Sequence, residues 1–560
     1  MIGGIIMKKT ILSIVLVMTM LVSLMSIPVA AEGTQISLYS GTPDLDFWGA
    51  LYDDEGNPIT KEVTIMTADQ LMGFAEMTSV NAFDGWTIKL GADMVINTGD
   101  ASEWSDSAKA PSHQWKGGSS YGYSFSGTFD GQGHVISGLY TVGSESKAAA
   151  LFGYASRNAT IQNVSVVNSY FGGVKYVSAV VGSYEPKMND ATLTIKNVHV
   201  QDTVVNASSQ DSAGFVGYLG EHEKTNTSVK LEDVSFVGGS ITVGRHSGGV
   251  VGRVYNGKTY ENGVAMTMNR IVLDTDLKFA STNADGKAGS LIGNLNGFRS
   301  VNASNIFIGG TLEVTASNPS NTAALVGILS NSARNVSGND RALLKVENVL
   351  IAQACKNVNS VWFNRSAAYN GTDSQSATDE LTNIYYDSDV VKIDTTGATG
   401  CKAVMKNDEP ATETGKSFAT LKGTDAGFTG WTTVANDYPT PTALPEIDVD
   451  LYKNYVAPPA QGGEDEGGDG SQGGDDGNDQ QGGTQNGGSD DGSQNNGSQN
   501  NGSGNNQNND TQTQAPAESE TTPTTTEKKS GCSSVVGTGF GLIALICLGG
   551  ATIVTKKSKK

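Results

Sequence analysis

The chain has 560 residues, of which 58 are acidic and 37 are basic, and its net charge of −21 argues against nucleic acid and anionic lipid as partners. It contains four cysteines, and only Cys355 and Cys401 lie in the part that is expected to fold, so a disulfide framework is excluded. These two cysteines either form one bridge or remain separate thiols, with Cys355 buried in a strand.

The N-terminal segment has the features of a secretory signal peptide. A pair of lysines precedes an uncharged and mostly apolar run, and small side chains lead up to Ala31. We expect cleavage after Ala31, which makes residues 1–31 the signal peptide and places the mature chain outside the cell. The pattern leaves open whether translation starts at Met1 or at Met7.

Residues 32–124 are expected to form an N-terminal cap and the first coils of a repetitive fold. Thr67, with Gln70 three residues later, fits a capping box, and an apolar face follows. We therefore predict a short helix from Ala68 to Thr78. A stack of coils has open ends that would promote aggregation, and this helix would close the N-terminal one.

Internal repetition is the main signal in residues 125–400. One recurring element is an apolar pair followed by glycine, and its copies are about 35 residues apart. A strand with a glycine that permits a sharp turn fits this element. The copies are Leu151-Phe152-Gly153, Val180-Val181-Gly182, Phe215-Val216-Gly217, Val250-Val251-Gly252, Leu291-Ile292-Gly293 and Leu325-Val326-Gly327.

A second element recurs at the same spacing and centres on an asparagine that is followed by valine or isoleucine. The alternation of apolar residues changes phase at this position, which predicts a corner whose side chains stack from coil to coil. The ladder positions are Asn163, Asn197, Asp233, Arg270, Asn305, Asn348 and Asn383. Since Asp233 and Arg270 replace asparagine in consecutive coils, we expect them to form an ion pair.

The repeats predict an all-β fold of stacked coils, a β-solenoid. Each coil of about 35 residues has room for three short strands, and no helix-period segment intervenes. A β-sandwich array would need roughly 100 residues per module, and a propeller would need about four strands per blade and ring closure. The solenoid fits the spacing better than either alternative.

The stretch from Phe125 to Leu139, FSGTFDGQGHVISGL, together with Leu151-Phe152-Gly153 and Ile161-Gln162-Asn163-Val164, resembles the GLUG-motif proteins of bacterial surfaces. The similarity extends over Ile59–Pro445 and is most specific between Phe125 and Asn163. It implies a right-handed parallel β-helix, a location at the cell surface and a role in adhesion. It implies no defined ligand and no catalytic residue.

The C-terminal part is expected to contain a cap, a stalk and an anchor. Residues 401–459 are predicted to cap the last coil, with Phe428 and Trp431 packed over that end. Residues 460–530 are rich in Gly, Asn, Gln and Asp and cannot form a core, which predicts a disordered acidic stalk. Residues 533–555 carry no charge and would span ~34 Å as a helix, enough for a membrane. The basic tail 556–560 then lies in the cytoplasm of a single-pass protein.

Catalytic and metal-binding patterns are weak in this sequence. No carboxylate pair of the glycosidase kind, and no His/Cys set at metal-ligand spacing, stands out along the repeats. Five histidines, at positions 113, 134, 199, 222 and 246, are scattered among the coils. We expect no cofactor, although acidic residues such as Asp44, Asp46, Asp53 and Asp54 could hold calcium weakly.

Exposed aromatic residues are the candidates for binding a glycan or a protein. They are Trp104, Tyr121, Tyr123, Tyr255 and Tyr260. Trp115 is expected in the core instead. Three functions remain open at this point: a surface adhesin that binds an extracellular glycan or protein, a spacer without a ligand, and a carbohydrate-active enzyme.

Overall fold

The computed structural model describes residues 35–118, 120–220, 224–255, 263–281, 286–315, 321–330, 343–358, 363–365, 380–387, 390–391, 401–404, 430–432 and 438–458. The predicted signal peptide, stalk and membrane helix lie outside these residues. Among the residues that are described, no helix is both long and apolar enough to cross a membrane.

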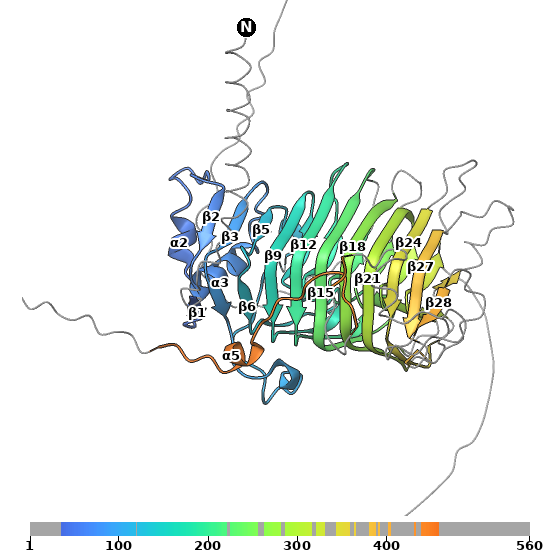
Figure 1. The fold of residues 1–560 in the computed structure, drawn as a ribbon. Helices are drawn as coiled ribbons and strands as arrows, with labels where there is room; N and C mark the ends of the chain where they lie inside the picture. The colour runs from blue at the N-terminus through green and yellow to red at the C-terminus, as the bar shows by residue number, and fades with distance from the viewer. Residues whose placement is uncertain are drawn as a thin grey trace, which may run out of the picture. The chain divides into compact units, whose positions relative to one another are not determined.

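The described chain is a stack of coils whose strands pair in parallel from one coil to the next (Figure 1). Three short strands precede the corner position, namely β2 (Glu62–Ile65), β3 (Thr87–Leu90) and β5 (Thr128–Asp130). The strands that run through the asparagine corner are β9 (Ala159–Val167), β12 (Thr192–Gln201), β15 (Ser228–Val243), β18 (Val264–Phe279), β21 (Phe298–Val314), β24 (Leu343–Ile351) and β27 (Glu380–Asp387), and β28 (Cys401–Val404) pairs with the part of β27 that follows it. Those that follow the corner as separate strands are β1 (Ile36–Leu38), β4 (Asp93–Val95), β6 (Val135–Ser137), β7 (Tyr140–Val142), β10 (Tyr170–Lys175), β13 (Val204–Gln210) and β25 (Ala354–Lys356). The predicted all-β solenoid is therefore confirmed as a parallel β-helix.

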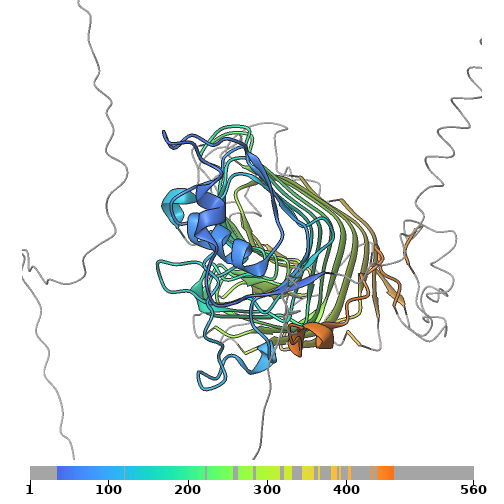
Figure 2. The same cartoon turned by 90° about the vertical axis from the view of Figure 1, so that its left-hand side faces the viewer.

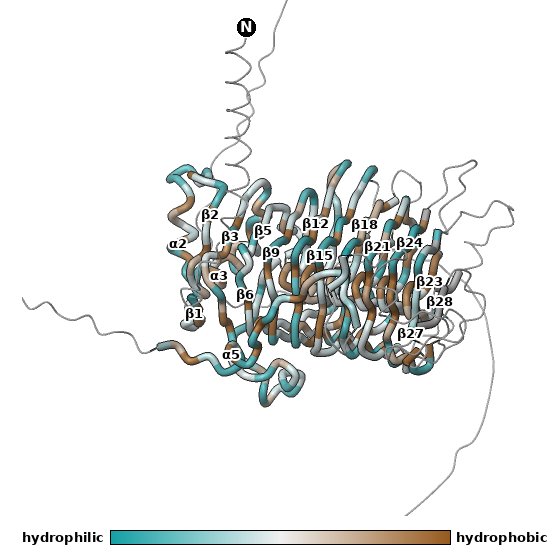
Figure 3. Tube along the Cα trace, in the orientation of Figure 1, coloured by the Kyte–Doolittle hydropathy of each residue, from teal (hydrophilic) through white to brown (hydrophobic). Residues whose placement is uncertain are grey.

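The other side of each coil forms a separate parallel sheet. Its strands are β8 (Phe152–Ser156), β11 (Val181–Glu185), β14 (Val216–Leu219), β17 (Val251–Tyr255), β20 (Ile292–Asn296), β23 (Val326–Ser330) and β26 (Phe363–Arg365). A small third sheet joins β16 (Ser247–Gly248), β19 (Ala288–Gly289) and β22 (Thr322–Ala323). Apolar side chains from these sheets meet in one core inside the coils, and Figure 3 shows hydrophobic segments that recur from coil to coil.

The ladder residues form the corner that the phase change predicts. All seven have a left-handed backbone, with φ between 51° and 57°. Asparagine and aspartate adopt this conformation more readily than other non-glycine residues, which explains why they dominate the position. The apolar residues that follow the corner align from coil to coil, as Val164, Val198 and Val234 do.

The predicted N-terminal helix is present as α3 (Ala68–Met77), preceded by α2 (Leu45–Gly49). The Thr67 side chain accepts a hydrogen bond from the Gln70 backbone N–H, and the Gln70 side chain accepts one from Met66. Phe74 is fully buried and stacks on Phe129 at 5.9 Å between ring centroids. Seen end-on in Figure 2, these helices lie across the first coils, so the predicted closure of this end is confirmed.

The glycines of the repeated apolar-apolar-Gly element have a different role from the expected one. They do not adopt the left-handed backbone of a turn. Instead they allow close approach between backbones: a Cβ on Gly252 would lie 2.3 Å from the Gly217 oxygen and 2.7 Å from the Ser212 oxygen. The preceding coil, at Gly217, and the segment that contains Ser212 both contact the strand at this point. Only glycine fits because any side chain would displace main-chain atoms.

Trp431 does not pack over the end of the last coil, so the prediction of a C-terminal cap is wrong for this residue. We call the described residues 430–432 and 438–458, which include α5 (Val449–Lys453), the C-terminal strap. The strap runs along the outside of the coils and returns toward the first ones (Figures 1 and 2). Trp431 packs against the side of the solenoid, on Val272, Phe307 and Leu350. These three side chains point outward and are apolar, so they provide an apolar surface that Trp431 covers. Phe428 lies outside the described residues.

Candidate functional site

The residue that follows each repeat glycine stands on the outer face of the β8–β26 sheet. Tyr154, Ser183, Tyr218 and Arg253 occupy this position in four successive coils, in direct register. The two tyrosines are absent from the main apolar core, although little of either is exposed. The repeat therefore places aromatic and cationic side chains in one column on the outside of the solenoid.

Neighbouring tyrosines extend this column into a continuous row, which we call the aromatic strip. Its members are Tyr121, Tyr154, Tyr176, Tyr218 and Tyr255. Ring centroids are 5.6 Å apart between Tyr121 and Tyr154, 6.5 Å between Tyr154 and Tyr176, and 5.2 Å between Tyr176 and Tyr218. The Arg253 guanidinium joins the last two members, 6.0 Å from the Tyr218 ring and 4.2 Å from the Tyr255 ring.

The strip is accessible mainly at its ends. Tyr121 is 53% exposed and Tyr255 is 36% exposed, while Tyr123, beside the first end on η2 (Tyr121–Tyr123), is 46% exposed. Tyr154 and Tyr218 are buried between them. Flat rings that are fixed by packing and partly open to solvent suit stacking on sugar rings or on side chains of a partner.

Charged groups line the strip. The Lys187 Nζ lies 4.8 Å from the Tyr121 ring centroid and donates a hydrogen bond of 2.8 Å to the Tyr121 carbonyl. The Tyr121 hydroxyl donates to Glu185. The Lys175 Nζ lies 5.2 Å from the Tyr176 ring centroid. Burial lowers the pKa of Lys187, and it raises the pKa of Tyr176 to about 12, so the phenol stays neutral at neutral pH.

A buried carboxylate lies behind the end of the strip that is formed by Tyr218 and Tyr255. The side chain of Asp211 is 2% exposed, and its Oδ1 lies 3.5 Å from the Arg253 NH1 and 3.7 Å from the His246 Nδ1. Burial lowers the pKa of His246, which favours the neutral ring. Asp211 and Arg253 are then the charge pair of this site, and the pair fixes the guanidinium between the Tyr218 and Tyr255 rings.

The structure separates the aromatic candidates. Tyr121, Tyr123 and Tyr255 are exposed as expected, and Tyr260 lies outside the described residues. Trp104 is wrong as a binding candidate, because it is 3% exposed and packs edge-on against Tyr140. Trp115 is buried, as expected. Sequence reasoning missed Tyr154, Tyr176 and Tyr218, yet two of the three directly follow a repeat glycine and could have been found there.

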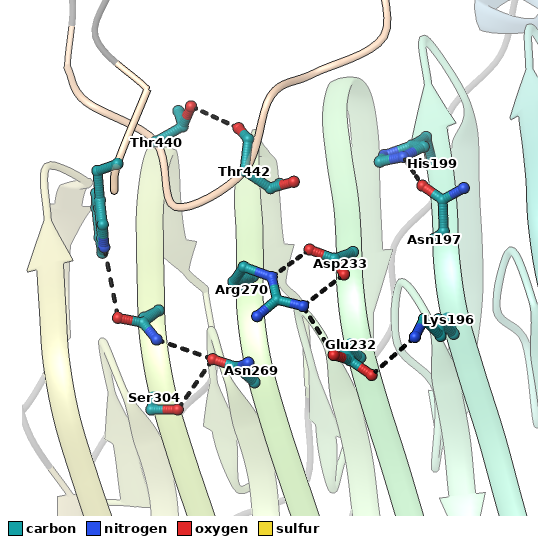
Figure 4. A network of polar contacts seen from close by, with 12 residues as sticks. Lys196, Asn197, His199, Glu232, Asp233, Asn269, Arg270, Ser304, Thr440 and Thr442 are labelled. Atoms are coloured by element: carbon teal, nitrogen blue, oxygen red, sulfur yellow. Dashed lines mark hydrogen bonds and ion pairs between the residues drawn. The ribbon is translucent and has the colours of Figure 1, made fainter. Parts of the chain in front are cut away.

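The ladder is a second organised array (Figure 4). The Asn197 Nδ2 donates to the Asn163 Oδ1 at 3.0 Å, and the Asn383 Nδ2 donates to the Asn348 Oδ1 at 3.1 Å. Asp233 and Arg270 form the expected ion pair, with NH2 to Oδ2 at 2.7 Å. The Arg270 NH2 also donates to Glu232 at 2.7 Å. Because these groups mostly bond one another, the ladder is a structural element.

His199 lies beside the ladder and provides a pH-dependent test. Its Nε2 lies 3.0 Å from the Asn197 Oδ1 and its Nδ1 lies 2.8 Å from the Ser235 hydroxyl. An amide oxygen only accepts, so the neutral ring carries its proton on Nε2 and Nδ1 accepts from Ser235. Burial lowers the pKa of His199 from 6.5 to about 4.

We expect the solenoid to lose stability as the pH falls from 6.5 to 4. In this interval the unfolded chain takes up a proton on His199 that the folded chain does not bind, which costs on the order of 3 kcal/mol in total. Urea unfolding at pH 7 and at pH 4.5 measures the change, and His199→Gln is expected to reduce this difference by the share of His199, leaving the smaller share of His246, whose pKa burial also lowers. An unchanged pH dependence in the variant would contradict the assignment.

The other titratable candidates have structural partners. The His134 Nδ1 lies 3.0 Å from the buried Asp93 carboxylate, and His113 packs edge-on against Tyr39. Cys355 is a free thiol whose pKa is raised to about 12 by burial, so the alternative of separate thiols holds. Within the described ranges, no group of three or more His, Cys, Asp or Glu side chains is placed to hold a metal ion.

These observations define the protein as a parallel β-helix repeat protein with an aromatic strip on its outer face. No family model matches the chain, and no curated protein matches it. A solved structure from Bacteroides ovatus, described provisionally as an immunoglobulin A1 protease, is similar with a TM-score of 0.31 and 14% identity. The match covers 57% of this chain and 86% of that one.

Proposed function

We propose that this protein is a cell-surface binding protein, an adhesin, that retains an extracellular glycan on the aromatic strip without cleaving it. The observation that carries this proposal is the row of packed tyrosines, exposed at Tyr121 and Tyr255 and lined by Lys175, Lys187 and Arg253. Rings stack on the apolar faces of sugars, while the flanking charges hydrogen bond to hydroxyl and carboxylate groups.

The remaining features of the proposal come from the sequence. The resemblance to GLUG-motif surface proteins suggests a right-handed β-helix, which fits the general preference for right-handed parallel crossovers. The signal peptide at 1–31, the stalk at 460–530 and the apolar segment at 533–555 suggest a single-pass plasma-membrane protein with an extracellular ectodomain. Its acidic charge makes nucleic acid an unsuitable partner.

A binding experiment with the full chain in detergent micelles tests this function. Immobilised protein would be offered a panel of polysaccharides and mucins, and both retention and newly formed reducing ends would be measured. We expect retention without release of sugar ends. The double variant Tyr121→Ala with Tyr255→Ala should bind roughly thirtyfold more weakly, because each substitution removes a stacking ring worth about 1 kcal/mol.

Two controls make the result specific. Val142→Ala removes an apolar side chain that is 50% exposed on β7 and is not a member of the strip, and it should leave retention unchanged. Retention in the presence of EDTA would show that weakly bound calcium is not required. Steady release of reducing ends would favour a carbohydrate-active enzyme, and no retention on any polymer or mucin would favour a spacer.

A further inference from the structure

The C-terminal strap is attached to the solenoid at two places that are far apart along the coils. The first attachment lies on the late coils. There the Tyr438 hydroxyl donates a hydrogen bond of 2.6 Å to Asp387 on β27, and its ring lies 5.6 Å from that of Phe307 on β21. Trp431 belongs to the same apolar cluster as Phe307 and Tyr385.

Between its two attachments the strap crosses the middle coils beside the ladder. Figure 4 shows Thr440 above the strand that carries Ser304 and Thr442 above the strand that carries Arg270. A hydrogen bond from Thr442 helps to lower the pKa of Asp233, after the larger effects of Arg270. The outward position two residues after the corner is polar in the middle coils, at His199 and Ser235, so this crossing buries little apolar surface.

The second attachment lies on the first coils, and we call it the latch. Val449 and Tyr452 of α5 pack against the outward side chains of Val95, Val135 and Val167. The Tyr452 hydroxyl donates a hydrogen bond of 2.6 Å to Asp93, a residue 359 positions earlier in the sequence.

Three polar contacts complete the latch. The Gly99 N–H donates a hydrogen bond of 2.8 Å to the Lys453 carbonyl. The Lys453 Nζ lies 3.5 Å from the Asp100 carboxylate. The Tyr455 hydroxyl donates to the Ile36 carbonyl on β1 at 3.1 Å. The end of the strap is thus held at the strand with which the described chain begins.

This arrangement reverses the direction of the chain. From β4 to β25 the coils advance seven times, which corresponds to ~34 Å at ~4.8 Å per coil. Without the strap, the chain would leave the solenoid at its last coils. With the latch closed, it passes Tyr455 at the first coils instead, next to the N-terminal cap.

We propose that the latch decides which end of the solenoid is tethered: the N-terminal end while α5 is docked, and the late coils, through Trp431 and Tyr438, once it is released. The inference rests on the proposed function in one respect only: that the tethered end of the solenoid is the end attached to the cell.

Distances between paired spin labels in the full chain, in detergent micelles, test the latch. The native cysteines would be replaced by serine or alanine, and labels would be placed at Gln35 and Val456 or at Lys356 and Val456. All three positions are exposed. We expect a short, narrow distance for the first pair and one longer by roughly 20 Å or more for the second, given the ~34 Å advance.

A latch variant and a matched control separate docking from general damage. Val449→Asp with Tyr452→Ala should broaden and lengthen the Gln35–Val456 distance, while circular dichroism of the solenoid stays unchanged. Leu451→Ala alters an exposed residue of the same helix and should leave both distances as they are. A shorter distance from Val456 to Lys356 than to Gln35 in the wild-type chain would overturn the proposal and leave glycan retention untouched.

Discussion

Gly252→Ala is expected to lower the free energy of unfolding of the solenoid by roughly 3 kcal/mol or more. The added methyl group would lie 2.3 Å from the Gly217 oxygen and 2.7 Å from the Ser212 oxygen. Both are main-chain atoms, so the strand must move and the hydrogen bonds between coils must stretch. Because each coil contacts mainly its neighbours, the damage should begin in β14, β17 and β20.

Chemical unfolding followed by circular dichroism measures this effect. Gly49→Ala is the matched control, since a Cβ at Gly49 meets nothing within 4 Å and its backbone is not left-handed. That substitution should change stability by less than about 1 kcal/mol, in the stabilising direction. Equal unfolding midpoints for the two variants would show that close backbone packing at Gly252 is not required.

Arg270→Met is expected to destabilise the solenoid by about 2 kcal/mol at neutral pH. The substitution leaves Asp233 and Glu232 side by side without their shared cation. The methionine must also adopt the left-handed backbone of position 270, where φ is 57°. The side chains of the ion pair are partly exposed, at 34% for Arg270 and 22% for Asp233, so water moderates the cost.

The pH dependence identifies the ion pair as the cause. The hydrogen bond from Arg270 lowers the pKa of Asp233 below its ordinary value of 3.8. The stabilisation is therefore complete above pH 3.8 and is lost as the pH falls through the lower pKa of the folded state. We expect the difference between wild type and Arg270→Met to shrink in the same acidic range, as measured by urea unfolding.

A compensating variant provides the control for this prediction. Asp233→Asn combined with Arg270→Asn restores amides at both positions and allows the contact that Asn197 makes with Asn163. Asparagine also suits the left-handed corner better than arginine. The double variant should recover most of the stability lost in Arg270→Met, and a further loss would mean that the ladder does not tolerate an amide step here.

The parts of the structure that could be predicted from the sequence are those with a repeating or local signal. The corner appears in the sequence because each coil repeats the same change of phase, and the Asp233–Arg270 pair follows from that register. The helix of the N-terminal cap is predicted because Thr67 and Gln70 lie within one turn of each other. The glycine column was found, although its cause is contact between coils and not a turn.

The binding surface could be predicted only in part. Tyr121, Tyr123 and Tyr255 were recognised as aromatic residues in loops, but a sequence does not show which of them share a face. Trp104 was misplaced because burial of a loop residue depends on what packs over it, here Tyr140. Tyr176 joins the strip through a turn whose position relative to Tyr154 and Tyr218 is fixed only by the stacking of coils.

The sequence by itself determined the period of the coils, their parallel stacking, the corner ladder and the closure of the N-terminal end, because short-range patterns specify each of them. Only the tertiary structure decided the course of the C-terminal strap and the assembly of the aromatic strip. Contacts such as Tyr452 with Asp93 join residues 359 positions apart and occur once. A single long-range contact leaves no periodic trace in the sequence, and its free energy depends on surfaces that exist only after the coils have stacked.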